Sequence, residues 1–217
     1  MRLLFAHGWA LDRSLWDRLL PELGALANDA VILDAGYYGP KTSAPDLEDE
    51  TFLGVGQSLG ALELLATPPA PLAGLVALDG FARFAQAEDF CAGQDVRRLT
   101  AMARRLEHHP GELIDEFLHR SLGCVTPKHG VPDRQALAEG LNRLTLLDGR
   151  DAARTLPIWR LHAAGDPIAP VPLTDASFVN ASVREREIRE GCDHLSPMTA
   201  PNACADLIRL ALNALQA

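Results

Sequence analysis

The sequence lacks a long apolar run, a surplus of basic residues and any closely spaced pair of cysteines. No apolar run approaches the roughly 20 residues that a membrane-spanning helix needs, so we expect no transmembrane segment. Acidic side chains number 29 against 20 lysines and arginines, and the net charge of −9 argues against a nucleic-acid-binding protein, which needs a basic face. The four cysteines show no CxxC or zinc-type spacing. With no secretory signal, they predict free thiols in a cytoplasmic protein that has neither a metal site nor a cofactor.

The overall composition and the length are typical of one folded domain. Apolar residues make up 47% of the chain and charged residues 23%, which excludes disorder as its global state. A length of 217 residues favours a single domain that spans residues 1–217.

Short apolar runs alternate with helix-like segments along most of the chain. The apolar runs lie at residues 3–6, 30–34, 51–55, 74–79 and 157–162, and a run of alternating charge at 184–189 suits a solvated edge strand. Helical periodicity covers residues 12–27 and 202–215. This alternation predicts an α/β fold, with a mostly parallel sheet and helices on both faces.

Residues 81–155 interrupt the alternation. They are charged and helix-like, with glycine and proline breaks at 110–111, 123 and 130–132. We interpret them as a helical cap inserted over the carboxyl ends of the strands, which is where open α/β sheets bind ligands.

The segment Gly56-Gln57-Ser58-Leu59-Gly60 joins an apolar run to a helix-like run. A strand-to-helix turn this sharp strains the backbone of its central residue and lifts the hydroxyl of Ser58 above the sheet, at a helix N-terminus. The flanking glycines are needed because a side chain there would collide with the neighbouring strand and helix. We therefore predict that Ser58 is a nucleophile; the alternative is a glycine-rich packing turn.

A nucleophilic serine needs a base, and the base needs a carboxylate. His194 lies on the loop between the last strand and the last helix, so we predict that it is the base. Asp166, just past the fifth strand, is the predicted acid, and Asp79 at the end of the fourth strand is its rival. The chain order Ser58, Asp166, His194 is the order expected of an α/β-hydrolase.

Attack on an ester creates an oxyanion, which needs two backbone N–H donors. Leu59, the residue after the nucleophile, is one predicted donor. Trp9, on the loop after the first strand, is the other, because Gly8 beside it lets the backbone approach the site. Alternatively, His7 and Trp9 simply plug the end of the sheet.

Together these segments resemble an α/β-hydrolase-fold serine esterase. The matching segments are His7-Gly8-Trp9, Asp34 to Gly39, Gly56 to Gly60, Gly165 to Pro170 and Gly191 to Pro197, and they span most of residues 1–80 and 156–217. Within that superfamily the chain is most similar to the pimeloyl-acyl-carrier-protein methyl ester esterases of biotin synthesis, through the opening Leu4 to Leu11 and Trp16. The resemblance implies an enzyme that hydrolyses a methyl or similar ester of an acyl chain carried on acyl carrier protein.

Two features depart from the usual pattern of these enzymes. Only 24 positions separate Asp34 from Ser58, so residues 39–50 leave little room for the usual crossover helix. We expect thin cover of one sheet face there. Gln57 replaces the bulkier aromatic residue or histidine often found before the serine, which leaves the details of the acyl pocket open but not the mechanism.

The segment 81–155 also carries a basic stripe. Arg97, Arg98, Arg104 and Arg105 recur at a spacing of seven residues, which is about two helical turns. On an acidic protein such a stripe suggests docking of an acidic partner, and acyl carrier protein fits. The alternative is an ordinary solvated helix face, balanced by nearby acids.

Two further functions stay open from the sequence. One is a general small-molecule carboxylesterase, thioesterase or lactonase, which would use the same three residues. The other is a non-catalytic ligand receptor built on a hydrolase fold, and an intact Ser-His-Asp set argues against it.

Overall fold

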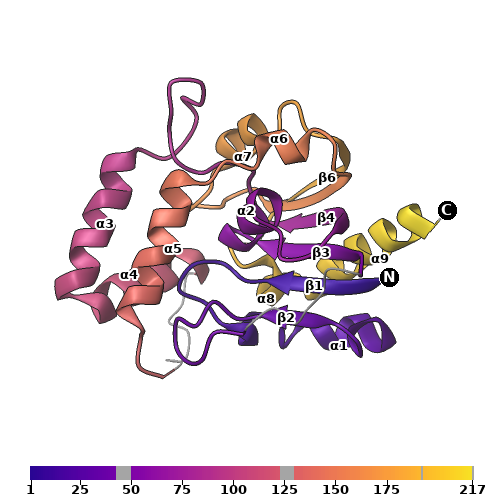
Figure 1. The fold of residues 1–217 in the computed structure, drawn as a ribbon, viewed down its shortest axis with the longest axis horizontal. Coiled ribbons are helices and arrows are strands. Elements are labelled where there is room, and N and C mark those ends of the chain that lie inside the picture. The colour runs from indigo at the N-terminus through magenta and orange to yellow at the C-terminus, as the bar shows by residue number, and fades with distance from the viewer. Residues whose placement is uncertain (43–49, 123–129, 192, 217) are drawn as a thin grey trace.

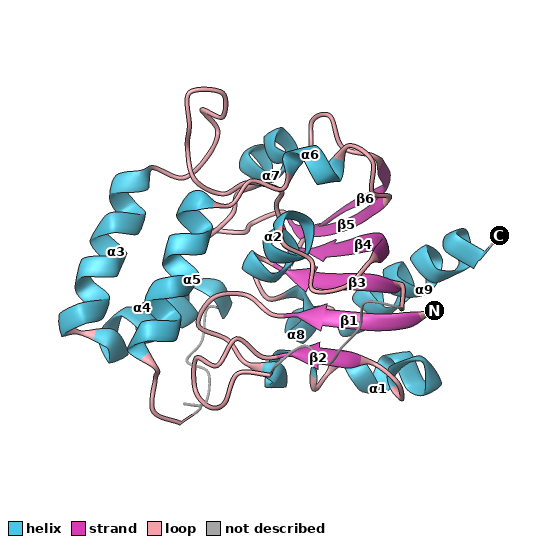
Figure 2. Ribbon diagram, viewed as in Figure 1, coloured by secondary structure: helices cyan, strands magenta, loops and turns pink. Residues whose placement is uncertain are grey.

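The computed structural model describes residues 1–42, 50–122, 130–191 and 193–216. Six strands form one sheet in the order β2-β1-β3-β4-β5-β6, and every neighbouring pair is parallel (Figure 2). The strands are β1 (Arg2–Ala6), β2 (Val31–Leu33), β3 (Phe52–Gln57), β4 (Leu72–Leu78), β5 (Ile158–Ala163) and β6 (Val183–Arg189). This architecture confirms the predicted α/β fold with a parallel sheet.

Burial along the strands follows their position in the sheet. Every residue of the inner strands β3 and β5 is buried, because helices cover both faces of a parallel sheet. Residues 184–186 of β6 are exposed, and this strand forms one edge of the sheet. The alternating charges of residues 184–189 therefore belong to an edge strand, as the sequence predicts.

The two faces of the sheet carry separate apolar cores. Successive side chains of a strand point to opposite faces, so Leu3 and Phe5 pack with α9 (Pro201–Gln216), whereas Leu4 and Ala6 pack with α2 (Leu59–Ala66). The α9 side also holds α1 (Leu19–Leu23) and α8 (Ser196–Thr199). The α2 side holds α6 (Arg150–Ala153) and the end of α7 (Val171–Ser177).

The helix expected over residues 12–27 is instead three short pieces. They are the 3₁₀ helix η1 (Arg13–Trp16), α1 and the 3₁₀ helix η2 (Gly24–Ala27). Pro21 lacks an N–H group and is tolerated only in the first turn of a helix, and α1 begins two residues before it. Gly24, with φ of +57°, then ends α1. The C-terminal helix, in contrast, forms where the sequence predicts it.

A helical segment lies between β4 and β5. It comprises α3 (Val96–His108), α4 (Pro110–Leu122) and α5 (Arg134–Leu146), and α3 packs against both of the others. Asp95 and Asp133 cap α3 and α5 by accepting backbone N–H bonds. Figure 1 shows these three helices beyond the carboxyl ends of the strands, away from the chain's N-terminus.

Some expectations involve residues that the structure does not describe. The connection 39–50 includes residues 43–49, and Cys124 and Cys192 also fall outside the described ranges, so those predictions stay predictions. Cys91 is an exposed free thiol, and Cys204 is buried on α9. None of the helices described is both long and apolar enough for a membrane span.

Candidate active site

Ser58 stands at a strained turn between β3 and α2. Its φ of +52° lies in the left-handed region, which side chains other than glycine rarely adopt. A Cβ on Gly56 would lie 2.4 Å from the backbone of Ala61, and one on Gly60 would lie 2.0 Å from the carbonyl oxygen of Ala6. Both flanking positions therefore exclude a side chain, for the reason that the sequence motif suggests.

The structure brings Ser58, His194 and Asp166 together in one chain of hydrogen bonds. His194 Nε2 lies 2.9 Å from Ser58 Oγ, and His194 Nδ1 lies 2.7 Å from Asp166 Oδ2. A carboxylate only accepts, so Nδ1–H donates to Asp166 and leaves Nε2 free to accept the serine proton. The three residues are at most 5% exposed, although they come from distant parts of the sequence.

The charges in this chain stabilise each other. Burial alone would lower the pKa of His194, but the negative charge of Asp166 and its hydrogen bond outweigh burial and raise it. Burial likewise opposes ionisation of Asp166, yet His194 and the backbone N–H of Ala169 hold the pKa of that carboxyl below its usual value. Asp166 Oδ1 accepts bonds from the N–H groups of Ile168 (2.8 Å) and Ala169 (2.9 Å), which fix the carboxylate under the imidazole.

Asp79, the rival acid, binds elsewhere. Its carboxylate accepts the N–H of Ala163 (3.0 Å), and both the N–H (2.7 Å) and the hydroxyl (2.9 Å) of Ser196. Complete burial is the main cause that raises its pKa to about 7. Asp79 therefore links the end of β5 to the first residue of α8, whereas the imidazole of His194 is bonded to Asp166.

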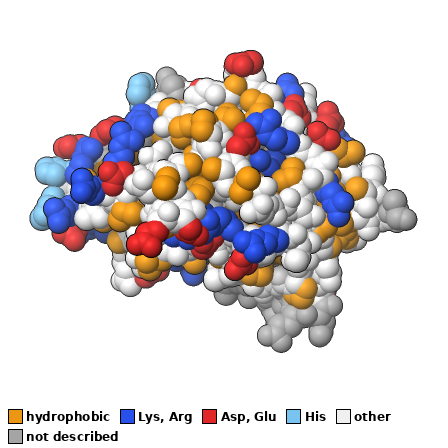
Figure 3. Space-filling model, turned by 90° about the horizontal axis from the view of Figure 1, so that it is seen from above, with side chains coloured by type: hydrophobic (Ala, Val, Ile, Leu, Met, Phe, Trp, Pro, Cys, Tyr) orange, Lys and Arg blue, Asp and Glu red, His pale blue; other side chains and the backbone are white. Residues whose placement is uncertain are grey.

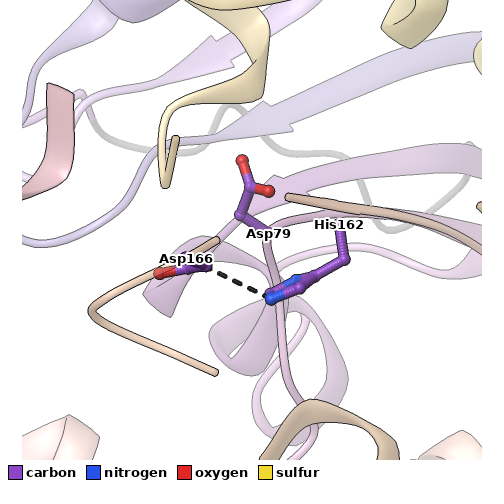
Figure 4. Close-up of side chains that lie close together, drawn as sticks. All are labelled: Asp79, His162 and Asp166. Carbon is purple, nitrogen blue, oxygen red and sulfur yellow. Dashed lines mark ion pairs between the residues drawn. The ribbon is translucent and has the colours of Figure 1, made fainter. Parts of the chain in front are cut away.

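His162 lies against Asp166 from inside β5, with Asp79 close by (Figure 4). Its Nε2 donates to the carbonyl oxygen of Ala169 (2.7 Å) and lies 3.4 Å from Asp166 Oδ2. Burial is the main cause that lowers the pKa of His162 to about 4, so the ring is neutral near pH 7 and its contact with Asp166 is not one between two charges.

Among the residues that the structure describes, these three side chains form a group that could hold a metal ion. One ligand atom from each of Asp79, His162 and Asp166 fits within 4.8 Å of the others. The oxygens of both carboxylates, however, already accept hydrogen bonds from Ser196, from His194 and from backbone N–H groups. The carboxylate oxygens of this group are thus already engaged in hydrogen bonds within the protein.

The loop after β1 passes close beside Ser58. A Cβ on Gly8 would lie 3.0 Å from the Cβ of Ser58 and 2.4 Å from Gln57 Oε1. His7 holds the loop, because its Nδ1–H donates to the Gly8 carbonyl oxygen (2.9 Å) and its Nε2 accepts the N–H of Ala35 (3.1 Å). Within the described residues, the backbone N–H groups of Trp9 and Leu59 have no protein acceptor. Both therefore remain available to a ligand.

Gln57 makes a contact that the sequence did not indicate. It does not line the cavity above Ser58; its amide Nε2 donates to the backbone carbonyl oxygen of His194 (2.8 Å) instead. The partners lie 137 positions apart, so no local pattern could have revealed the bond. Gln57 thus helps to hold the loop of the predicted base.

An apolar cavity of about 250 Å³ opens above Ser58. Its lining includes Trp9, Phe84 and Ile168 from the sheet side, and Leu99 and Phe117 from α3 and α4. A cavity with mainly apolar walls beside a hydroxyl suits the acyl part of an ester.

The four arginines of the predicted stripe do not share one environment. Arg98 and Arg105 line the cavity, whereas Arg97 and Arg104 lie outside the lining. Adjacent residues of a helix differ by about 100° in direction, so the stripe consists of two columns. Figure 3 shows basic side chains and histidines gathered at the end of the molecule where α3 lies. Arg120 of α4 joins the lining, a placement that helical spacing alone could not assign.

Comparison with known protein families identifies one match. The sequence model of the alpha/beta hydrolase family matches residues 3–207. No curated protein matches the chain at the level of sequence.

Solved structures resemble it in fold at low identity. A thermophilic esterase from Thermogutta terrifontis is 18% identical, with a TM-score of 0.75 over 100% of this chain and 91% of that one. A bromoperoxidase from Bacillus anthracis is 15% identical, with a TM-score of 0.78 over 99% and 91%. The enol-lactonase from Burkholderia xenovorans LB400 is 14% identical, with a TM-score of 0.72 over 97% and 90%.

Proposed function

The chain belongs to the alpha/beta hydrolase family, and we propose that it is a serine esterase that hydrolyses a carboxylic ester of an acyl chain. The observation that carries this proposal is the hydrogen-bonded chain from Ser58 through His194 to Asp166, at the mouth of an apolar cavity. The resemblance of the fold to esterases is consistent with it.

The geometry supports a two-step reaction. His194 takes the proton of Ser58 as the hydroxyl attacks the ester carbonyl, and Asp166 stabilises the imidazolium that forms. The N–H groups of Trp9 and Leu59 would bind the oxyanion. The alcohol leaves with a proton from His194, which then activates water to release the acid from Ser58. No metal or cofactor takes part in this scheme.

For the substrate we propose a methyl or similar ester of an acyl chain on acyl carrier protein, as in pimeloyl-carrier formation for biotin synthesis. In this proposal α3–α5 act as the cap, and Arg97, Arg98, Arg104 and Arg105 dock the acidic carrier. Four exposed arginines on one helix of a protein with a net charge of −9 support it.

A second candidate is a small-molecule ester, thioester or lactone. The cavity volume of about 250 Å³ is compatible with it, because this space accommodates a small ester without any carrier. The fold likeness to an enol-lactonase is compatible with it, although fold alone does not fix a substrate.

Two measurements test the proposal. A fluorophosphonate probe should label the protein covalently at Ser58, and Ser58→Ala protein should stay unlabelled. Hydrolysis of acyl-carrier-protein methyl esters should then be compared with hydrolysis of free short-chain esters, thioesters and lactones. Absence of labelling together with absence of hydrolysis across the panel would refute the esterase. Hydrolysis of free substrates alone would favour the second candidate.

A further inference from the structure

The cavity above Ser58 contains charged side chains as well as apolar ones. Arg98 and Arg105 reach it from α3, and Glu116 and Arg120 reach it from α4. Arg105 Nη1 lies 2.7 Å from Glu116 Oε2, so these two form an ion pair and largely neutralise each other.

The other two arginines bind only neutral oxygens. Arg98 Nη1 lies 3.4 Å from Gln94 Oε1, and Arg120 Nη2 donates to the carbonyl oxygen of Pro167 at 3.1 Å. In the described part of the chain, neither guanidinium has a carboxylate within ion-pair distance. The lining therefore keeps an excess of positive charge from Arg98 and Arg120.

We infer that Arg98 and Arg120 bind an anionic group on the substrate, a carboxylate or a phosphate, while the ester of the same molecule lies at Ser58. The inference rests on the proposed esterase function and names its substrate class. The apolar side chains Leu99 and Phe117 line the same cavity and would contact the chain that joins the two groups.

Two physical arguments favour this assignment. A guanidinium offers a planar fork of N–H donors that matches the oxygens of a carboxylate or phosphate. In addition, a net charge of −9 repels anions from most of the surface, so an anionic ester needs a local positive site to bind. Arg98 and Arg120 provide that site on the cavity that contains the nucleophile.

The first test compares matched esters. The substrates are straight-chain monomethyl dicarboxylates, the same chains ending in a neutral amide, and the same chains ending in a phosphate. We expect the anionic esters to have the higher kcat/KM. Arg98→Gln and Arg120→Gln should each lower that value by about tenfold or more on anionic esters, as loss of a hydrogen bond to a charged group does, and leave the amide esters nearly unaffected. The carboxylate and phosphate series then identify which anion is preferred.

The control is Arg134→Gln on α5, which removes an exposed charge from the same helical segment but outside the cavity lining. It should leave both substrate classes unchanged. A wild-type protein that prefers the amide esters, or equal losses on anionic and neutral esters in Arg98→Gln and Arg120→Gln, would overturn the inference. That result would make the two arginines ordinary solvated side chains.

A second measurement separates this inference from the proposed reaction. Ser58→Ala protein cannot form the acyl-enzyme, and calorimetry on it measures binding of the free dicarboxylate. We expect binding that weakens at high ionic strength and is lost when Arg98→Gln and Arg120→Gln are added together. Binding without hydrolysis by the wild type would keep the anion site and reject the esterase. Hydrolysis without arginine-dependent binding would do the opposite.

Discussion

The sheet and the helical segment α3–α5 use polar residues in opposite ways. At the carboxyl ends of the strands, Ser58, Asp79, Asp166 and His194 are all at most 5% exposed, and each is bonded to a defined protein partner. On α3 and α4 most charged side chains are exposed, and Arg105 and Glu116 keep about half of their surface in water. The difference suggests that the proposed reaction depends on the fixed positions of the buried residues. Substrate recognition would instead depend on the exposed, movable charges of α3 and α4.

Removal of the Ser58 hydroxyl, the proposed nucleophile, is the strongest test of the buried site at the ends of the strands. Ser58→Ala should lower kcat by about 10³-fold or more, because it removes the hydroxyl that is hydrogen-bonded to His194 Nε2. Circular dichroism and the melting temperature should stay near those of the wild type, since the change removes one oxygen atom. Near-native turnover by this variant would mean that Ser58 is not the nucleophile.

The acid comes next. Asp166→Asn should lower kcat by about 10²- to 10⁴-fold, because an asparagine does not hold His194 in the productive tautomer. Esterase assays on the purified variant measure this directly. The comparison with Asp79→Asn is the discriminating one, and a larger loss in Asp79→Asn would show that the acid lies on β4.

The pH profile of kcat/KM sharpens the same point. His194 acts as a base only when neutral, and Asp166 raises its pKa above the usual 6.5. Activity should therefore fall as the pH drops through that raised pKa, by about tenfold per pH unit below it. Asp166→Asn removes the negative charge, so the residual activity of this variant should have its midpoint at lower pH. An unchanged midpoint would contradict the coupling between the two groups.

Asp79 should affect stability more than chemistry. An asparagine offers one acceptor oxygen, whereas Ala163 and Ser196 direct backbone N–H groups at both oxygens of Asp79. Asp79→Asn should lower the free energy of unfolding by about 1–3 kcal/mol, the usual effect of leaving a buried donor without a partner. Urea denaturation gives this value, and kcat should fall less than it does in Asp166→Asn. Unaltered stability would argue against the proposed tie.

The smallest expected effects concern the exposed arginines of α3. Replacing Arg97, Arg98, Arg104 and Arg105 with glutamate should raise KM for a carrier-bound ester several-fold, with little change on a small neutral ester. The effect should shrink as salt rises, because such charges are screened over about 10 Å at 0.1 M ionic strength. Equal changes on both substrates, or none, would reject carrier docking and leave the esterase untouched.

The features that the sequence could predict are those that depend on neighbouring residues. The glycines around Ser58 and the carboxyl-end loops that carry Asp166 and His194 follow from local patterns, because strand, turn and helix signals lie within a few residues of each other. In the broken helix at 12–27, Pro21 and Gly24 outweigh the apolar periodicity that predicts one continuous helix.

Contacts between distant segments were out of reach. The bond from Gln57 to the carbonyl oxygen of His194 joins residues 137 positions apart, and only the folded chain brings them together. The arginines show a related limit. A spacing of seven identifies residues that share a face of a helix, but it does not say which face meets the cavity.

Trp9 links the two halves of the molecule mechanically. Its backbone N–H lies on the loop beside Ser58, and its indole Nε1–H donates to the carbonyl oxygen of Leu137 in α5 at 2.8 Å. A Cβ on Gly140, one turn further along α5, would lie 2.7 Å from the indole ring, so the two surfaces fit without a gap. A movement that swung α5 away from the sheet would pull on the same residue whose backbone N–H we propose as an oxyanion donor. The same movement would then open the cavity and displace the N–H group of Trp9 from Ser58. The open form would therefore have an incomplete site.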